Sequence, residues 1–511
     1  MPMNPLRALA VLISCLVAGV AFADDPPKNA PAKPAATTSA ATMPADVTTH
    51  HTLKLGDRTL NYDAVAGSLP LTDTKGEHKA DVFYVAYTLP GAQAASRPIT
   101  FAFNGGPGAG SAYLQIGALG PRVLEVGDAP AAPNPSARLV DNPETWLDLT
   151  DLVFVDPVGT GYSRGVGSED DVAKEFWGVK QDVEAMAAFV RLYLTRTSRL
   201  ASPKFLVGES YGGFRAARLT NMLLGDPGGV AITGAFLISP VLEFETMNMS
   251  AYEPLGWALG LPSYAATKLE ADGKLTPEAL TDVERFALGD YLTALAGGSR
   301  DEATAKRIDA AVAGFTGLPL ELVTRLEGRV PMNVFVKEFR RADGRLISRY
   351  DGSVSAADPY PASVTPRGGD AILRATIAPF TSAFVDYARD ELGFRTDLSY
   401  RLLSEQVGHR WDWRSAMSGS FGGGGYVGSL DELREALALN PQLRVVVAHG
   451  MTDLITPYFA SRFLIDQLPK MGDTPRVKLL LYPGGHMMYL RAASRALLHR
   501  DAGALYRAVP G

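Results

Sequence analysis

Seven short apolar runs alternate with helical or loop segments, and this alternation restricts the possible fold more than any other feature of the chain. Each run is rich in β-branched residues and is closed by Gly, Pro or Asp, as is typical of a buried strand. Between the third and fourth runs, apolar residues recur at three- and four-residue steps from Val172 to Tyr193, which predicts an amphipathic helix. Residues 214–224 are predicted to form a second helix. The runs begin at Ala80, Pro98, Asp151, Lys204, Ile232, Leu443 and Arg476. This order predicts an α/β fold with a mostly parallel sheet covered by helices on both faces.

The alternation is interrupted between residues 241 and 441, where the signals become helical. Thr276 and Pro277, for example, are typical of a helix start. We therefore expect residues 48–240 and 442–511 to form the two parts of one α/β core, and residues 241–441 to form an inserted, largely helical cap. A chain of 511 residues, 46% of them hydrophobic, is long enough for one large core with such an insertion.

The N-terminal residues are predicted to direct export. Arg7 precedes the apolar run Ala8 to Val20, and the segment 1–23 ends in Ala21-Phe22-Ala23, a small-x-small cleavage pattern. A membrane anchor is the alternative, but the run is short for a bilayer. A second alternative is lipoprotein processing at Cys15. Residues 24–47 are rich in Pro, Ala and Thr and are predicted to be a disordered leader.

Charge and cysteine content exclude several classes of function. The net charge of -6 is mild for this length and argues against a nucleic-acid partner. Cys15 is the only cysteine, so the chain after residue 23 has no disulfides and no thiol chemistry. Export without cysteine indicates a periplasmic or secreted protein, most simply of a bacterium. After cleavage of the signal, no association with a membrane is expected.

Two serines lie in a G-x-S-x-G pattern, and their contexts differ. Ser210, in GESYGG, directly follows the strand that begins at Lys204 and directly precedes a helix. Such a strand-to-helix turn is the nucleophile elbow of the α/β-hydrolase fold, which lifts the hydroxyl clear of the sheet. Ser163, in GYSRG, follows Pro157 and two glycines deep in a loop. We predict that Ser210 is the nucleophile and that GYSRG is a decoy.

A serine nucleophile requires a base, and the base requires an orienting acid; in this fold both follow the serine in the order Ser, acid, His. His486 lies in a glycine-rich loop just past the strand that begins at Arg476, where a catalytic base would be. Asp453 follows the preceding strand and fits the orienting acid. His449 ends that strand and is open to interpretation as an ordinary buried or loop histidine, whereas His499 is expected on the surface of a terminal helix.

A glycine-rich segment, NGGPGAGS (residues 104–111), follows the strand that begins at Pro98. An α/β hydrolase takes one backbone N–H of its oxyanion hole from this place. A plain turn would not explain so many glycines, because each costs conformational entropy. The segment lacks the Gly-Lys-Ser/Thr of a phosphate loop, neither glycine loop matches a dinucleotide site, and the histidines are too scattered for a metal cluster. No metal or organic cofactor is expected.

With these residues in hand, the sequence resembles the serine carboxypeptidase family (the S10 peptidases), and specifically a bacterial branch of it. NGGPGAGS, VDPVGTGYS and GESYGG are similar to three of the family's segments, and HGMTDLITP and GGHMM are similar to those that carry its acid and base. The matches lie in order from about residue 80 to 490, with the cap less recognisable.

The resemblance implies a role for each matching residue. Ser210 would be the nucleophile, His486 the general base and acid, and Asp453 the orienting acid. Backbone N–H groups of Gly106 and Tyr211 would form the oxyanion hole. Asn104, the backbone of Gly105, and Glu209 would hold the C-terminal carboxylate of a peptide substrate. Recognition of a carboxylate by Glu209 requires that one of the two acids keep a proton; the alternative is that Glu209 is a structural carboxylate at a helix start.

Two positions depart from the family pattern. Ala118 stands where many members have a second glutamate that supports the carboxylate clamp, and Ala109 replaces the cysteine of the glycine loop. The implied activity is the removal of single residues from peptide C-termini, best at acidic pH. An esterase or acyltransferase on the same scaffold is the alternative, and a non-catalytic binding protein is a third reading that the complete Ser, His and Asp set disfavours.

Overall fold

The structure is a computed structural model that describes residues 43–91, 96–126, 138–225, 229–298, 301–416 and 427–508. The predicted signal segment with Cys15, and the predicted leader up to residue 42, lie outside the described residues. Within the described part, the first strand, β1 (Val47–Leu55), begins at the last residue assigned to the leader. None of the described helices has the length and apolar character needed to cross a membrane.

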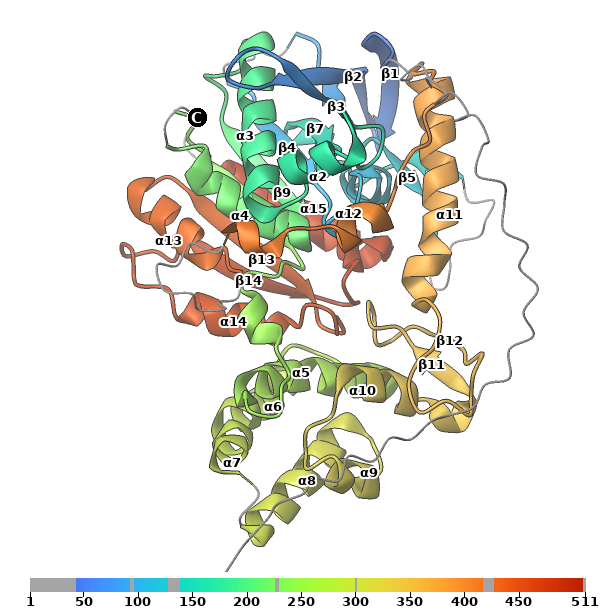
Figure 1. Ribbon diagram of the computed structural model, residues 1–511, viewed down its shortest axis with the longest axis vertical. Coiled ribbons are helices and arrows are strands. Elements are labelled where there is room, and N and C mark those ends of the chain that lie inside the picture. The colour runs from blue at the N-terminus through green and yellow to red at the C-terminus, as the bar shows by residue number, and fades with distance from the viewer. Residues whose placement is uncertain are drawn as a thin grey trace, which may run out of the picture. The chain divides into compact units, whose positions relative to one another are not determined.

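A ten-stranded mixed sheet organises the described residues (Figure 1). Its order is β1-β2-β3-β7-β4-β9-β10-β13-β14, with β8 paired to β3. From β7 to β14 each neighbouring pair is parallel, whereas β1, β2 and β3 pair antiparallel with one another and with β7. The strands after β1 are β2 (Arg58–Thr72), β3 (His78–Thr88), β4 (Ile99–Phe103), β7 (Asp151–Val155), β8 (Arg164–Gly165), β9 (Lys204–Glu209), β10 (Gly234–Ile238), β13 (Arg444–Gly450) and β14 (Val477–Tyr482). The predicted α/β class with a mostly parallel sheet is confirmed.

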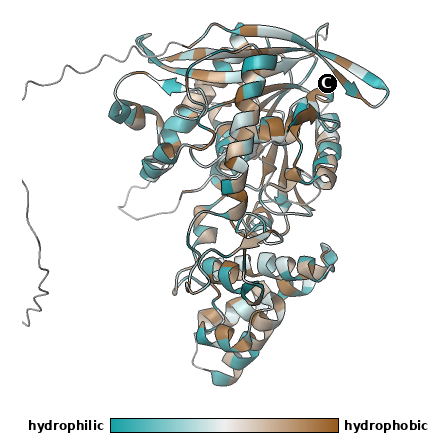
Figure 2. Ribbon diagram, turned by 90° about the vertical axis from the view of Figure 1, so that its right-hand side faces the viewer, coloured by the Kyte–Doolittle hydropathy of each residue, from teal (hydrophilic) through white to brown (hydrophobic). Residues whose placement is uncertain are grey.

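Strands β1 and β2 were not among the seven predicted runs, and their sequences explain why. Buried and exposed residues alternate along much of both strands, so that neither contains a continuous apolar run. In Figure 2 the central strands are mostly brown, whereas the long antiparallel strands mix teal and brown. The remaining short strands form two hairpins, β5 (Arg122–Leu124) with β6 (Leu139–Asp141) and β11 (Arg345–Ile347) with β12 (Ser355–Ala357).

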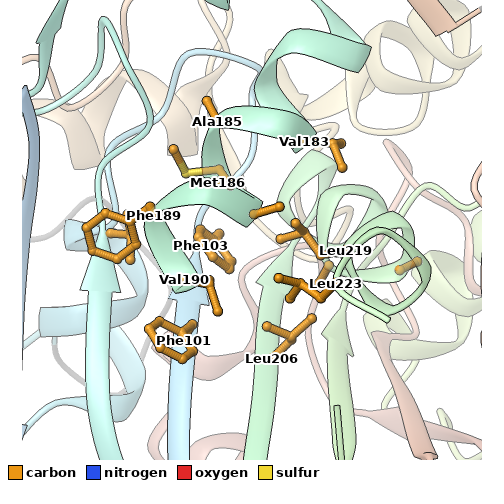
Figure 3. Packing of buried hydrophobic residues seen from close by; sticks show 14 of the residues in the cluster. Phe101, Phe103, Val183, Ala185, Met186, Phe189, Val190, Leu206, Leu219 and Leu223 are labelled. Carbon is orange, nitrogen blue, oxygen red and sulfur yellow. The ribbon is translucent and has the colours of Figure 1, made fainter. Parts of the chain in front are cut away.

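Helices cover both faces of the sheet, as the strand order requires. On one face α3 (Val179–Arg196) and α4 (Tyr211–Met222) pack on β4 and β9, and Figure 3 shows Val190, Leu219 and Leu223 beside Phe101 and Leu206. Alternate residues of β4 point to the opposite face, where Ala102 lies in a second cluster. That second cluster includes residues of α1 (Ala112–Leu114), α11 (Ala371–Asp386) and α15 (Ala492–Arg507).

The single helix predicted from Val172 to Tyr193 is in fact two helices, α2 (Glu169–Phe176) and α3. The break falls at Trp177 and Gly178. The Trp177 indole donates to the carbonyl oxygen of Val158 at 3.1 Å, and Gly178 pairs in extended conformation with Asp412. These tertiary contacts interrupt an apolar periodicity that is continuous in the sequence.

The region predicted as one helical insertion, residues 241–441, divides into two parts. Its first part has its own hydrophobic cluster, formed by α5 (Pro254–Ala271), α6 (Thr281–Phe286), α7 (Leu292–Gly297), α8 (Glu302–Thr316), α9 (Leu320–Arg325) and α10 (Met332–Glu338) together with α14 (Tyr458–Asp466). Its second part belongs to the core: Phe380 and Phe384 of α11 pack on one face of the sheet, and Leu433 of α13 (Leu430–Leu439) packs on the other. The cap is therefore shorter than predicted, because apolar faces at helical spacing do not reveal which core they join. The remaining described α-helix is α12 (Glu405–His409).

Candidate active site

Ser210 lies in a sharp turn between β9 and α4, as the sequence predicts. Its φ of 58° and ψ of -125° place a non-glycine residue in a strained region of backbone space. The turn is so tight that a β-carbon at Gly208 would lie 2.0 Å from the carbonyl oxygen of Gly212. Glycine is therefore required by close backbone approach, which is the physical reason for the G-x-S-x-G pattern here. Ser210 is partly exposed.

Ser163, the serine of the second G-x-S-x-G pattern, is fully buried. Its hydroxyl donates to the carbonyl oxygen of Asp156 at 2.6 Å and accepts from the backbone N–H of Phe83 at 2.8 Å. The first bond lies within the loop after β7, and the second joins that loop to β3. Because this hydroxyl already donates one structural hydrogen bond and accepts another, the geometry agrees with its interpretation as a decoy.

Asp453 and His486 meet at the carboxyl ends of β13 and β14. The imidazole Nδ1–H of His486 donates to Oδ2 of Asp453 at 2.8 Å, and both side chains are buried. The acid is held in turn, because its Oδ1 accepts the N–H groups of Ile455 and Thr456 and its Oδ2 accepts the Thr456 hydroxyl. Burial lowers the pKa of His486, but the Asp453 carboxylate more than offsets this, so that the pKa is raised above its ordinary value.

The backbone places His486 close to the nucleophile turn. The N–H of Ser210 donates to the carbonyl oxygen of Ile238 at 2.9 Å, and Glu209 pairs with Ile238 across β9 and β10. The next residue, Ser239, donates its hydroxyl to the carbonyl oxygen of His486 at 2.9 Å. Neighbouring strands are about 4.8 Å apart, so Ser210 and His486 share one edge of the sheet. Across the described residues no hydrogen bond joins the Ser210 hydroxyl to His486; such bonds are often long before substrate binds.

The other two candidate histidines have partners elsewhere. His449 is fully buried, and its Nε2 lies 2.8 Å from the hydroxyl of Ser461. Burial lowers the pKa of His449 to about 4. His499 on α15 was expected on the surface but is only partly exposed, and its Nε2 lies 2.9 Å from Asp148.

The segment 348–353 also lies against this site, and sequence reasoning did not identify it. The carbonyl oxygen of Tyr350 accepts the backbone N–H of His486 at 2.6 Å, and its ring lies edge-on to the imidazole with centroids 5.4 Å apart. Backbone bonds also join Arg349 to Leu454 and Gly352 to Thr452. The loops that carry the acid and the base are therefore braced by a segment whose sequence has no recognisable motif.

The glycine-rich segment after β4 lies directly on the nucleophile turn. A β-carbon at Gly105 would lie 2.6 Å from both the carbonyl oxygen of Glu209 and the amide nitrogen of Tyr211. Gly106 has a φ of 104°, which favours glycine. In the part of the chain that the structure describes, the N–H groups of Gly106 and Tyr211 have no hydrogen-bond acceptor. The arrangement leaves two backbone donors available beside Ser210.

Asn104 is held rigidly at the start of this segment. Its side-chain Oδ1 accepts the N–H of Leu114 at 3.0 Å, and its carbonyl oxygen accepts a guanidinium N–H of Arg215 at 2.8 Å. Arg215 is fully buried and forms an ion pair with Asp182 at 2.7 Å. The first helix after the nucleophile therefore also fixes the glycine-rich segment.

Glu209, directly before the nucleophile, is buried with only 5% of its surface exposed. Its Oε2 accepts a side-chain N–H of Asn104, and its Oε1 accepts the hydroxyl of Tyr489 at 2.7 Å. Burial raises the pKa of Glu209, against the lowering effect of His486 and of these two donors. The structure thus brings Asn104, Gly105 and Glu209 together at the nucleophile. Sequence reasoning missed Tyr489, which stands three residues after His486.

Known proteins similar to this chain are named as carboxypeptidases. The sequence model of the serine carboxypeptidase family matches residues 57–263. Carboxypeptidase sxa2 of Schizosaccharomyces pombe is 27% identical over 39% of this chain and 37% of its own length. Serine carboxypeptidase-like 51 of Arabidopsis thaliana is 36% identical over 24% of each chain. The chain therefore matches these relatives over about a quarter to two fifths of their length. They come from a fungus and a plant, and the bacterial placement stays a prediction.

Among solved structures, the fold resembles that of Kex1(delta)p, a prohormone-processing carboxypeptidase from Saccharomyces cerevisiae. The TM-score is 0.52 and the identity 15%, with 87% of this chain and 91% of that chain covered. This likeness shows the α/β-hydrolase fold.

Proposed function

The chain belongs to the serine carboxypeptidase family, and from this membership we propose that it removes single residues from the C-termini of peptides through an acyl-enzyme. Ser210 attacks the carbonyl carbon of the last peptide bond while Nε2 of His486 accepts the serine proton. His486 then donates that proton to the departing amine. A water molecule attacks the resulting ester by the same route in reverse and regenerates the enzyme.

Asp453 and two backbone donors assist each of these steps. Because Asp453 accepts Nδ1–H, the imidazole keeps the tautomer in which Nε2 is free to accept a proton. The carboxylate also stabilises the imidazolium that forms. The N–H groups of Gly106 and Tyr211 are available to bind the oxyanion of the tetrahedral intermediate, an interaction worth about 3–4 kcal/mol per donor in such sites.

Buried Glu209, directly beside the nucleophile, is the observation that favours exopeptidase activity over general esterase activity. A hydrolase that accepts any ester has no use for a desolvated carboxylate there. With Asn104 and the backbone of Gly105, a protonated Glu209 would bind the substrate's C-terminal carboxylate, because the two acids then share one proton.

This arrangement predicts two opposed pH effects. Binding of the substrate carboxylate requires the proton on Glu209 and is lost as the pH rises, which is the basis of the proposed preference for acidic pH. Proton acceptance requires neutral His486, whose pKa in the free enzyme is raised, so kcat/KM also falls at low pH. We expect kcat/KM for free-acid peptides to pass through a maximum, and we expect the fall on its alkaline side to be absent for amidated peptides.

The decisive experiment compares matched peptides that end in a free acid or in an amide. We expect the free acid to be cleaved with about a tenfold to a hundredfold higher kcat/KM at pH 5, the worth of one charge-assisted interaction. Glu209→Gln should reduce this preference, whereas Glu184→Gln, at an exposed position of α3, should not. Equal rates on both peptides in the wild-type enzyme would refute carboxylate recognition and leave an esterase or acyltransferase.

Two accompanying proposals rest on composition and sequence pattern. The protein is proposed to be exported through residues 1–23 to a periplasm or the exterior. Neither metal nor organic cofactor takes part in the proposed chemistry.

A further inference from the structure

Tyr489 connects the loop of the catalytic histidine to the carboxylate beside the nucleophile. It lies in a short helical turn, Met488–Leu490, three residues after His486, and is fully buried. Its hydroxyl donates to Oε1 of Glu209 at 2.7 Å. Because burial and the neighbouring carboxylate raise the pKa of Tyr489 well above its ordinary value, the phenol keeps its proton and can only donate to a charged Glu209.

The Tyr489 ring lies against the helical turn that follows the glycine-rich segment. A β-carbon at Gly117 would lie 3.2 Å from the edge of this ring. The next residue is Ala118, the position of the missing glutamate, and it is buried in the same helical turn, Gln115–Leu119.

Several ionisable groups face Glu209, but Tyr489 alone among them donates a hydrogen bond to it in the described residues. His486 and Asp453 act on it through charge from the base and acid loops. Tyr113 of α1 and Tyr350 of the segment 348–353 also lie within electrostatic range. Asn104, which is not ionisable, holds the other oxygen.

We propose that Tyr489 is a positioning residue that fixes Glu209 for recognition of the substrate's C-terminal carboxylate and sets the pH range of that recognition. The inference rests on the proposed function and concerns how this chain performs it with a single acid in the clamp. A pair of carboxyl groups shares one proton, so each raises the proton affinity of the other. A phenol acts in the opposite sense, because its hydrogen bond stabilises the ionised carboxylate.

Removal of the hydroxyl should therefore extend carboxylate binding to higher pH. Without the Tyr489 donor, Glu209 ionises less readily and keeps the proton that the substrate carboxylate needs. In the wild-type enzyme, KM for a free-acid peptide should rise as the pH passes the ionisation of Glu209. In Tyr489→Phe this rise should move upward by about one to two pH units, the worth of a hydrogen bond to a charged group.

The experiment measures KM against pH for matched free-acid and amidated peptides, with the full chain. Tyr489→Phe and Tyr489→Leu both remove the hydroxyl donor. A measurement on either variant that folds is sufficient to test the inference. The matched control is Tyr482→Phe, which removes another buried phenol donor from a carboxylate, Asp501, outside the site. It should leave the profile of KM unchanged.

The outcomes separate this inference from the proposed function. The role of Tyr489 is supported if its substitution moves the rise of KM to higher pH for the free-acid peptide. This shift should be absent for the amidated peptide and absent in Tyr482→Phe. A free-acid profile that does not move, or that moves equally for the amide, overturns it, even where the variant is less stable to heat. A wild-type enzyme that treats acid and amide alike overturns the proposed function and this inference together.

Discussion

Replacement of Gly105 by alanine tests whether the glycine-rich segment must lie directly on the nucleophile turn. The added β-carbon would lie 2.6 Å from the carbonyl oxygen of Glu209 and from the amide nitrogen of Tyr211, whereas ordinary contact begins at 3.4 Å. Segment and turn must therefore separate by about 0.8 Å, since backbone atoms cannot rotate away as a side chain does.

This displacement moves the N–H of Gly106 away from the developing oxyanion. Misplacement of reacting groups by about 1 Å costs on the order of a hundredfold in rate, and loss of an oxyanion donor costs about a hundredfold to a thousandfold. We expect Gly105→Ala to lower kcat by about that range.

The assay is steady-state hydrolysis of a chromogenic ester and a free-acid peptide, with thermal unfolding measured in parallel. Gly314→Ala is the matched control, because a β-carbon at that position of α8 meets nothing within 4 Å. A folded Gly105→Ala enzyme whose kcat stays within about threefold of wild type would refute the oxyanion assignment.

Three other substitutions test separate parts of the account. Asp453→Asn should lower kcat by about a thousandfold to ten-thousandfold, because an amide favours the wrong tautomer of His486; a loss below about tenfold, with the fold intact, would contradict its role. Ser163→Ala should keep kcat but destabilise the protein to urea by about 1–3 kcal/mol, because the N–H of Phe83 loses its acceptor; lost activity with unchanged stability would make this serine functional. The pKa of His449 is lowered to about 4, so His449 binds a proton more readily in the unfolded chain. The free energy of unfolding is therefore unaffected by this group above pH 6.5 and falls by roughly 3 kcal/mol as the pH drops to about 4. His449→Gln should remove that part of the acid destabilisation, and an equal loss in both proteins would disprove it.

The nucleophile turn could be predicted from sequence because its requirements are local. Strand, tight turn and helix are consecutive in the chain, and the close approach of Gly208 to Gly212 leaves glycines that can be recognised. Asp453 and His486 could be predicted because each follows a strand, and parallel strands bring their carboxyl ends to one edge. Their mutual bond of 2.8 Å agrees with that reasoning.

The parts that escaped prediction depend on contacts between distant segments. Nothing in the local sequence marks Tyr489 as the donor to Glu209, since the residues are separated by 280 positions. Similarly, α11 has a helical apolar face, but only the folded chain shows that Phe380 packs on the sheet and not within the cap. The break at Gly178 depends on Asp412, which is also remote in the sequence.

The central claim, an activated hydroxyl at residue 210, is tested most directly by labelling with a fluorophosphonate and mapping the adduct by mass spectrometry. The account predicts one adduct, on Ser210, that is abolished in Ser210→Ala, greatly slowed in His486→Ala and unaffected in Ser163→Ala. No adduct on the folded wild-type protein, or an adduct on a different serine, would contradict it.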